Sequence, residues 1–270
     1  MRRRSQLYVP ANNPKMIRKA AGLQADSILF DLEDAVPPNE KAAARESLGP
    51  VIGGIEWGHR ELAVRINAPE TPEGKQDLAA MSKEPRIATL VVPKAESDLS
   101  PLAHTTGKGF IPIIETPKGV LHIEEVVRSR GAVGVTYGAG DLAASVGGDL
   151  RTYETNAFVR TLIVVAAAAY GLDAIDKVFF DLKDLEGFRA EALDAKRLGY
   201  VGKQVVHPSQ VPIANEAFSP SPEELAWARA VIQAYESAAR EGRGAIRVQD
   251  RLVDAVHYRW AKRTLERAEP

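Results

Sequence analysis

Short apolar runs, many of them rich in β-branched residues, alternate along this chain with alanine-rich stretches of helical character. Apolar runs of this kind are typical of parallel strands whose outer face is covered by helices. Eight such strands within 270 residues favour a TIM (β/α)8 barrel over a doubly wound sheet. The predicted strands cover residues 6–9, 27–32, 61–66, 87–92, 110–114, 132–137, 174–175 (or as far as 180) and 204–207.

The segments between the strands predict helices, several of which begin at Pro, Asn or Asp residues that favour helix starts. These helices cover residues 14–21, 39–48, 75–82, 119–128, 154–170 and 184–198. Beyond residue 207, residues 221–240 predict a long helix and residues 249–267 a final amphipathic stretch. We therefore expect a barrel domain over residues 1–215 and a C-terminal helical extension over residues 216–270, which could reach a neighbouring subunit's site.

The composition argues against several classes of protein. The formal net charge of -1 gives no electrostatic reason to expect binding to nucleic acid or to an anionic membrane. The chain contains no cysteine, which excludes disulfides, thiolate metal sites and a cysteine nucleophile. The basic residues 1–4 precede a stretch too short and polar for a signal-peptide core, and no long apolar span follows. These features predict a soluble cytoplasmic protein.

Polar side chains stand at the ends of the predicted strands. In a TIM barrel the carboxyl ends of the strands share one mouth, where the chemistry takes place. Carboxylates gathered near an arginine and a lysine indicate a divalent cation, and Mg²⁺ usually takes one or two protein carboxylates. We predict Glu115 and Asp141 as direct ligands, because each follows an apolar strand and adjoins a turn rich in Gly or Pro. The strand-end residues are Asp31, Glu33, Asp34, Arg65, Asn67, Lys94, Glu115, Asp141, Asp181 and His207.

Some of these residues have a plainer explanation. Asp31 and Asp181 suit a role in capping or bracing a loop. Arg65 can simply balance the carboxylates, but its planar guanidinium also suits a substrate carboxylate or an enolate oxygen. Lys94 raises the alternative of a Schiff-base aldolase, but a metal site makes that route unnecessary, so we interpret it as an electrostatic brace. His207 is as compatible with a packed, hydrogen-bonded histidine as with a catalytic one, and we do not expect it to bind the metal.

The segment GAGDLA at residues 138–143 matches the G-x-G-x-x-A pattern of dinucleotide-binding folds. Two observations argue against that interpretation. An aspartate inside the phosphate-binding turn would repel a pyrophosphate, and no second strand ending in a ribose-binding acid follows. We therefore do not expect a nicotinamide or flavin cofactor.

The chain carries a series of specific motifs in a fixed order: residues 5–10 with 12–14, DLEDAV (31–36), VRIN (64–67), VPKAE (92–96), ETP (115–117), GAGDL (138–142), DLEG (184–187) and GKQVVHPSQ (202–210). Together they resemble the citrate lyase beta-subunit family. That family lies within a larger group of Mg²⁺-dependent acyl-CoA lyases and 2-oxo-acid aldolases that share a TIM-barrel fold. The resemblance covers almost the whole chain.

The resemblance implies how the acidic residues are used. In the family, the residues that match Glu115 and Asp141 hold Mg²⁺. Those that match Glu33 and Asp34 hold water molecules around the cation. The resemblance therefore explains how the clustered acids of ILFDLEDAV, residues 28–36, are tolerated beside one another.

The same resemblance implies the substrate contacts and the acid/base group. Arg65 matches the residue that meets the 2-oxo acid, and Gly140, in the GAGDL motif, is expected to contact the same substrate. Asp254 matches the family's acid/base aspartate, which is often delivered from an adjacent subunit. This chain departs from the family pattern there, because Val256 replaces a common proline and an upstream glycine is absent.

The thioester carrier implied by the resemblance is CoA or a phosphopantetheine on an acyl carrier protein. Lys203, His207 and Pro208, together with the basic residues 1–4, are candidates for contacting it. The resemblance also implies a homotrimer. Neither composition nor motif spacing bears on the number of subunits.

As a whole, the resemblance implies a Mg²⁺-dependent carbon–carbon lyase, or the reverse condensation. Its substrate would be a 3-hydroxyacyl thioester of the citryl-, malyl- or citramalyl-CoA type, and its products an acetyl thioester and oxaloacetate, glyoxylate or pyruvate. Three alternatives remain open. The chain could be a citryl-acyl-carrier-protein lyase subunit of a citrate lyase complex, a non-catalytic 2-oxo-acid-binding subunit, or a CoA-independent 2-oxo-acid aldolase.

Overall fold

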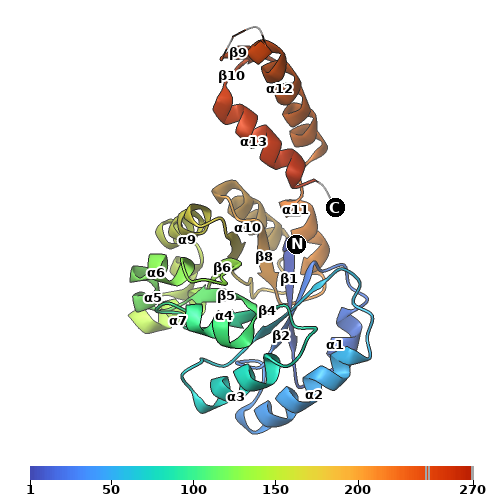
Figure 1. The fold of residues 1–270 in the computed structure, drawn as a ribbon, viewed down its shortest axis with the longest axis vertical. Helices are drawn as coiled ribbons and strands as arrows, with labels where there is room; N and C mark the ends of the chain where they lie inside the picture. Colours follow the sequence, from blue (N-terminus) through green and yellow to red (C-terminus); the bar gives the residue numbers. More distant parts are fainter. Residues whose placement is uncertain (241, 243, 269–270) are drawn as a thin grey trace. The chain divides into compact units, whose positions relative to one another are not determined.

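The computed structural model describes residues 1–240, 242 and 244–268. Eight parallel strands close into a barrel in sequence order, with β1 paired to both β2 and β8 (Figure 1). The predicted TIM barrel is therefore confirmed. The strands are β1 (Ser5–Pro10), β2 (Ser27–Asp31), β3 (Glu61–Arg65), β4 (Thr89–Val92), β5 (Gly109–Ile114), β6 (Gly134–Tyr137), β7 (Asp173–Asp176) and β8 (Gly202–Val205).

Successive residues of a barrel strand face two different cores. In β2, Leu29 belongs to a cluster formed by residues of the strands alone, together with Ala63 and Ile175. Its neighbours Ile28 and Phe30 instead pack in a larger cluster that contains helix residues. Because both faces of the strands are buried, most strand residues are apolar, and this is why apolar runs locate most of the strands in the sequence.

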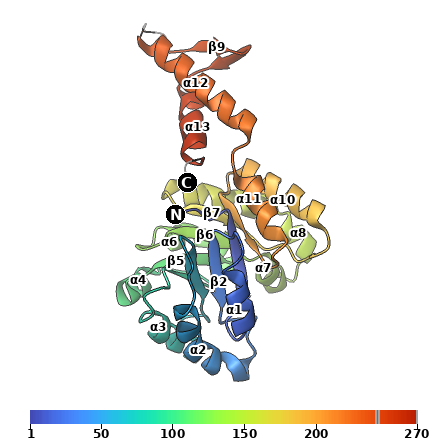
Figure 2. The same ribbon diagram turned by 90° about the vertical axis from the view of Figure 1, so that its right-hand side faces the viewer.

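Helices surround the barrel on its outer side (Figures 1 and 2). Thr71 and Thr116 illustrate how they begin, since each side chain accepts a hydrogen bond from the backbone N–H three residues later. The helices of this part of the chain are α1 (Pro14–Ala20), η1 (Pro38–Glu40), α2 (Lys41–Gly53), α3 (Pro72–Met81), α4 (Ser100–Thr106), α5 (Pro117–Leu121), α6 (Ile123–Val127), α7 (Ala139–Val146), α8 (Leu150–Glu154), α9 (Ala157–Ala169), α10 (Leu185–Leu198) and α11 (Gln210–Phe218).

The structure corrects several predicted boundaries. The helix expected over residues 119–128 is two short helices, α5 and α6, which meet at His122. The helix expected over 154–170 begins only at Ala157, because the Asn156 side chain accepts a hydrogen bond from Val159 N–H and caps α9. Strand β7 ends at Asp176, so it does not extend to residue 180. Helices α4, α7, α8 and α11 were not predicted.

The chain divides into two compact units, Met1–Glu216 and Ala217–Pro270. The second unit contains α12 (Pro222–Arg240), β9 (Ile246–Val248), β10 (Arg251–Val253) and α13 (Ala255–Glu266). Strands β9 and β10 form an antiparallel hairpin whose turn residues, Gln249 and Asp250, both have positive φ, as a type I′ turn requires. The amphipathic stretch expected from residue 249 therefore begins as a hairpin, and its helix starts only at Ala255.

Among the described residues, no helix combines the length and the apolar character needed to cross a membrane.

The amino-terminal end of the barrel is held together by the buried side chain of Arg3. Its Nη2 donates to Glu61 Oε1 at 2.7 Å, and its Nη1 donates to Asp173 Oδ2 at 2.7 Å. Glu61 and Asp173 are the first residues of β3 and β7, so Arg3 joins strand starts on different sides of the ring. The basic start of the chain thus contacts the end of the barrel opposite to the carboxyl ends of the strands, which speaks against the expected contact with a thioester carrier.

This ion pair generates a prediction about stability. Replacement of Arg3 by methionine leaves the Glu61 carboxylate buried without its cation, and loss of one partner of a buried pair typically costs about 3–5 kcal/mol. We expect the free energy of unfolding, measured with urea at pH 7, to fall by about that amount. Arg86→Met is the matched control, because the Arg86–Glu84 pair lies at the surface and should contribute less than about 1 kcal/mol.

The same pair predicts the pH dependence of stability. Burial alone would raise the pKa of Glu61, but hydrogen bonds from Arg3 and Thr89 hold that pKa below its ordinary value. The stabilisation is therefore complete above the ordinary glutamate pKa and is lost as the pH falls through the lower pKa of the folded protein. If Arg3→Met and Arg86→Met lowered the free energy of unfolding equally, the Arg3–Glu61 pair would not be a stabilising buried interaction.

Candidate active site

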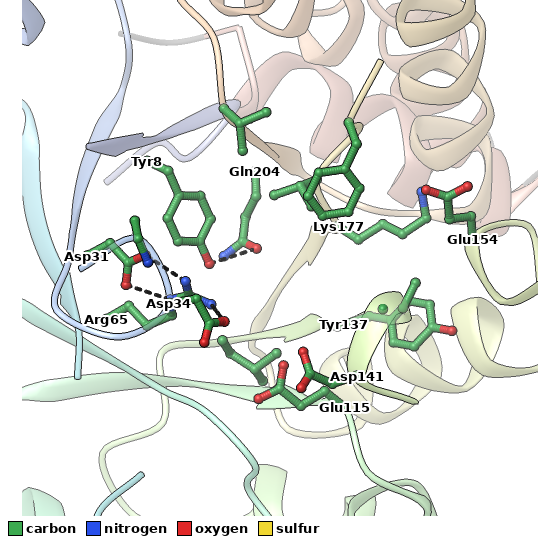
Figure 3. A pocket seen from close by; sticks show the side chains of 18 of the residues that line it. Tyr8, Asp31, Asp34, Arg65, Glu115, Tyr137, Asp141, Glu154, Lys177 and Gln204 are labelled. Atoms are coloured by element: carbon green, nitrogen blue, oxygen red, sulfur yellow. Dashed lines mark hydrogen bonds and ion pairs between the residues drawn. The ribbon is translucent and has the colours of Figure 1, made fainter. Parts of the chain in front are cut away.

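A cavity of about 440 Å³ opens at the carboxyl ends of the strands (Figure 3). Its lining includes the last residues of β1, β2, β3 and β6 and the residues that directly follow β5 and β7. The predicted site residues Arg65, Glu115, Gly140 and Asp141 all line this one cavity, although they are far apart in sequence. The remaining lining residues are Tyr8, Pro10, Met16, Asp31, Asp34, Ala35, Ile113, Tyr137, Gly138, Ala139, Glu154, Lys177, Val178, Phe180, Gln204 and Val206.

Arg65 is fixed on one side of the cavity by the acids of the loop after β2. Its Nη2 donates to Asp31 Oδ2 at 2.6 Å, and its Nε donates to Asp31 Oδ1 at 2.8 Å. Its Nη1 lies 3.1 Å from Glu33 Oε2 and 3.3 Å from Asp34 Oδ2. Burial would lower the pKa of this guanidinium, but the surrounding carboxylates keep that pKa above its ordinary value. Arg65 is therefore a permanently charged and well-oriented group.

Asp31 also accepts hydrogen bonds from the backbone of its own loop. Its Oδ1 accepts from Glu33 N–H at 2.9 Å, and its Oδ2 accepts from Ala35 N–H at 3.0 Å. Asp31 thus braces the loop, as its position at a strand end suggested. Asp181 has the same kind of role, because its Oδ1 accepts from the backbone N–H groups of Lys183 and Asp184.

A second group of carboxylates surrounds the ammonium of Lys94. The Nζ atom donates to Glu33 Oε1 at 3.0 Å and lies 4.0 Å from Glu115 Oε1 and 3.9 Å from Asp141 Oδ1. Figure 3 shows the Glu115 and Asp141 side chains facing into the cavity. Together with the contacts of Arg65, two cationic side chains are shared among five carboxylates, so this part of the mouth carries an excess of negative charge.

Glu115 is the most deeply buried of the predicted metal ligands, with 3% of its surface exposed. Burial, together with the neighbouring Glu33 and Asp141, raises the pKa of Glu115 to about 8. Its Oε1 accepts a hydrogen bond from Lys94 N–H at 2.8 Å. A Cβ atom at Gly138 would lie 2.4 Å from Glu115 Oε2, so only glycine leaves room for this carboxylate.

This arrangement suits a divalent cation. No set of three or more Asp, Glu, His or Cys side chains within residues 1–240, 242 and 244–268 forms a ready-made metal cage. Two carboxylates, Glu115 and Asp141, are nevertheless enough for Mg²⁺, which keeps its other positions for water and substrate. A cation would also offset the burial and the neighbouring carboxylates that raise the pKa of Glu115. The donor set therefore fits a magnesium ion.

Gly140 lies in the first turn of α7 and lines the cavity. A Cβ atom at this position would meet nothing within 4 Å, so the backbone of Gly140 borders open space. The first N–H groups of a helix have no partner within the helix and favour negative charge. The start of α7 can therefore receive an anionic substrate group beside Asp141.

Five polar residues that line the cavity were not predicted as site residues from the sequence: Tyr8, Tyr137, Glu154, Lys177 and Gln204. The Arg65 guanidinium lies over the ring of Tyr8, 5.0 Å from its centroid, and the Tyr8 hydroxyl lies 3.4 Å from Gln204 Oε1. Alternation in β1 could have located Tyr8, because Leu7 and Val9 pack among helix residues while Tyr8 packs against the inner cluster of strand residues. Tyr8 thus supports Arg65 from inside the barrel.

The residues proposed to contact the thioester carrier have different environments. Lys203 has no exposed surface, and its Nζ donates to Asp176, Glu191 and the carbonyl of Lys177. Its ammonium thus lies among acceptors within the protein, and the contact of Lys203 with a thioester carrier stays a prediction. His207 is exposed, with its Nδ1 2.8 Å from Ser209 Oγ, and Pro208 is partly exposed.

Asp254 lies in the C-terminal unit, where it caps α13. Its Oδ1 accepts hydrogen bonds from Val256 N–H at 2.9 Å and from His257 N–H at 3.3 Å, and lies 2.8 Å from His257 Nδ1. These contacts, above all that with His257, lower the pKa of Asp254. The side chain is 46% exposed, so the carboxylate is accessible from solvent.

Comparison with known proteins relates the chain to characterised enzymes. It is 37% identical over 275 residues to a (3S)-malyl-CoA thioesterase of Cereibacter sphaeroides, an alignment that covers 98% of this chain and 94% of that protein. It is 32% identical over 300 residues to an L-malyl-CoA/beta-methylmalyl-CoA lyase of the same species, with the same coverage.

Solved structures give the same relationship. The protein CitE of Mycobacterium tuberculosis, in complex with magnesium, acetoacetate and coenzyme A, superimposes with a TM-score of 0.81 at 34% identity, covering 98% of this chain and 97% of that one. The citrate lyase beta subunit of M. tuberculosis, complexed with oxaloacetate and magnesium, superimposes with a TM-score of 0.71 at 34% identity, covering 80% of this chain and 96% of that one.

The family model for HpcH/HpaI aldolase/citrate lyase matches residues 4–101 and 109–208. These residues include every barrel strand and all the acids gathered around Arg65 and Lys94. The expected resemblance is thereby confirmed, as is the prediction that the chain is an enzyme of this lyase family. The chain belongs to the HpcH/HpaI aldolase/citrate lyase family.

Proposed function

We propose that this protein is a Mg²⁺-dependent carbon–carbon lyase that cleaves a malyl-type CoA thioester into an acyl-CoA and a small 2-oxo acid, or catalyses the reverse condensation. One observation carries the proposal: Arg65 lines the same cavity as Glu115 and Asp141, two acids that suit a magnesium ion. A 2-oxo acid has a carboxylate and an adjacent keto oxygen, so it can meet a cation and a guanidinium together. The relatives support this choice, because one is a malyl-CoA lyase and another binds magnesium and coenzyme A.

Glu115 and Asp141 would hold the magnesium ion, and Glu33 and Asp34 would orient water molecules beside it. When bound, the ion polarises the keto group of the 2-oxo acid as a Lewis acid. The backbone at Gly140 would receive the substrate carboxylate at the start of α7. The chain's own contribution here is to bind the substrate and orient it.

Arg65 would stabilise the negative charge that develops on the reacting oxygen. Its guanidinium is already held by Asp31 and lies over the ring of Tyr8, so it needs little reorganisation when the charge appears. Both Nη atoms keep a fixed planar geometry that suits two acceptors. Arg65 therefore contributes electrostatic stabilisation from a preorganised position.

The charges of the cavity favour a 2-oxo acid with one carboxylate. Among the described residues that line it, the cationic side chains are Arg65 and Lys177, and both are already paired with carboxylates. A second carboxylate, as in oxaloacetate, would thus enter without a dedicated partner. Met16, Phe180 and Val206 supply apolar lining that suits an acyl group. We therefore expect glyoxylate or pyruvate to be preferred over oxaloacetate.

Asp254 would move the proton on the α-carbon of the thioester, a contribution of about 10²- to 10⁴-fold. In cleavage, the hydroxyl proton would pass to water, the carbon–carbon bond would break with its electron pair moving to the thioester enolate, and the α-carbon of that enolate would accept a proton from Asp254. The products are a 2-oxo acid and an acyl-CoA. In condensation, the carboxylate removes the same proton before the α-carbon attacks the carbonyl.

We also propose a homo-oligomer, for which the family resemblance suggests a trimer. Three apolar side chains close to Asp254 in sequence, Leu252, Val256 and Trp260, are exposed to between 40% and 69%. Exposed apolar groups around an acidic residue favour an interface that covers this face. In a variant of this proposal, the thioester is carried by an acyl carrier protein and not by free CoA. The chain would then act within a larger complex.

Thioester hydrolysis is a second candidate, because a relative at 37% identity is a (3S)-malyl-CoA thioesterase. A thioesterase would release malate and free CoA from malyl-CoA without breaking the carbon–carbon bond. A lyase would release glyoxylate and acetyl-CoA. The two activities therefore differ in whether a free thiol appears.

The proposal predicts turnover that depends on Mg²⁺. Acetyl-CoA or propionyl-CoA, mixed with glyoxylate or pyruvate, should give a condensed thioester with Mg²⁺ and none with EDTA, as followed by mass spectrometry. Free thiol, assayed separately, reports hydrolysis. Oxaloacetate serves as the comparison substrate and should react more slowly. No conversion with either CoA thioester, despite Mg²⁺-dependent 2-oxo acid binding, would favour a carrier-protein substrate or a non-catalytic subunit.

The proposed metal ligands can be tested by binding. Glu115→Gln and Asp141→Asn should each weaken Mg²⁺ binding at least about tenfold, because each removes one of the two anionic ligands. Calorimetric titration with MgCl₂ measures the effect. Glu154→Gln is the matched control, since this acid lines the same cavity but is not among the contacts of Lys94. Unchanged Mg²⁺ affinity in Asp141→Asn would remove Asp141 from the ligand set.

The role of Asp254 predicts a separation of binding from turnover. Asp254→Asn should bind Mg²⁺ and glyoxylate as the wild type does, while its kcat falls at least about 10²-fold. Asp250→Asn is the matched control, because it changes a nearby acid of the same hairpin at a position of positive φ that asparagine tolerates. Normal kcat in Asp254→Asn would end its assignment as the acid/base group.

A further inference from the structure

The backbone conformation of Lys94 places its side chain among the acids of the site. Its φ is 51°, in the left-handed region that a lysine rarely adopts. In this conformation Lys94 N–H donates to Glu115 Oε1, while Lys94 Nζ donates to Glu33 Oε1. One residue therefore contacts two of the acids, through its backbone and through its ammonium.

The ammonium has two different relations to the three acids around it. It forms a hydrogen bond with Glu33 at 3.0 Å. It stays 4.0 Å from Glu115 and 3.9 Å from Asp141, beyond hydrogen-bonding distance but well within electrostatic range. The ammonium of Lys94 thus balances the charge of the two proposed metal ligands without donating a hydrogen bond to either of them.

A positive charge in this place has opposite effects on the protein without metal and on metal binding. In the protein alone, it reduces the repulsion between Glu33, Glu115 and Asp141. A divalent cation held by Glu115 and Asp141 would instead lie close to the ammonium and be repelled by it. The two positive charges therefore compete for the same carboxylates.

We propose that Lys94 is a tethered counter-cation that stabilises the metal-free site and weakens its affinity for Mg²⁺. This inference rests on the proposed metal site at Glu115 and Asp141. It assigns to Lys94 a role different from that of a nucleophile or a ligand. In the metal-free protein, Lys94 reduces the repulsion between the acids. When Mg²⁺ binds, the ion would take over that function.

The experiment compares Lys94→Met with Lys94→Arg. Methionine removes the charge from an unbranched side chain of similar length, and arginine keeps the charge. The hydrogen bond from the backbone N–H of residue 94 to Glu115 does not require either side chain. Lys118→Met is the matched control, because Lys118 is an exposed lysine that pairs with Glu96, which is not one of the acids around Lys94. Calorimetric titration with MgCl₂ alone gives Kd, and thermal unfolding in EDTA and in MgCl₂ gives the change in Tm.

We expect Lys94→Met to bind Mg²⁺ at least about fivefold more tightly than the wild type, because it removes a positive charge about 4 Å from the two carboxylates that would hold the ion. Its Tm in EDTA should fall, and the rise in Tm on adding Mg²⁺ should exceed that of the wild type. Lys94→Arg and Lys118→Met should behave as the wild type does.

Equal or weaker Mg²⁺ binding in Lys94→Met would overturn the inference. So would equal effects of Lys94→Met and Lys94→Arg, which would show that the charge is not the cause. If the wild type binds no Mg²⁺ at all, the proposed metal site fails and the inference fails with it. Mg²⁺ binding in the wild type that Glu115→Gln abolishes, with no change in Lys94→Met, would overturn the role of Lys94 alone.

Discussion

Parallel pairing of β8 with β1 closes the sheet, and every feature of the site depends on that closure. It brings the carboxyl ends of eight strands into one ring, so residues as far apart in sequence as Tyr8 and Gln204 line one cavity. The opposite end of the ring is held by the buried pair of Arg3 and Glu61. Stability and chemistry are thus assigned to opposite ends of the same strands, as is general for this fold.

The site is defined by an imbalance of charge more than by any single residue. Arg65 and Lys94 are shared among five carboxylates, and the buried Glu115 shows the consequence in its raised pKa. Buried carboxylates that lack sufficient positive charge are costly unless another cation joins them. This cost makes the acids of the mouth suitable for a divalent ion and gives a reason for a lysine beside them.

The strands could be predicted because burial on both faces forces an apolar run, and a run such as residues 27–31 is readable without any other information. The residues at the strand ends followed from the same reasoning. The short helices were harder to predict, because single capping contacts, such as the one between the Asn156 side chain and Val159 N–H, decide where a helix begins. The burial of Lys203 could not be predicted, because Asp176 and Glu191, which accept hydrogen bonds from its ammonium, lie elsewhere in the sequence.

Asp31 and Glu115 show why the sequence alone could not divide the acids into roles. Both follow apolar residues at the carboxyl end of a strand. Asp31 accepts two backbone N–H groups and two bonds from Arg65, so its charge is fully compensated. Glu115 accepts one hydrogen bond from a backbone N–H and lies 4.0 Å from the Lys94 ammonium, so its charge is less well compensated than that of Asp31. The cavity is therefore polarised, with a fixed cation on one side and uncompensated carboxylates on the other. A 2-oxo acid bound through a magnesium ion would suit this arrangement, because the ion would be held by the carboxylates while the guanidinium would face the substrate oxygen.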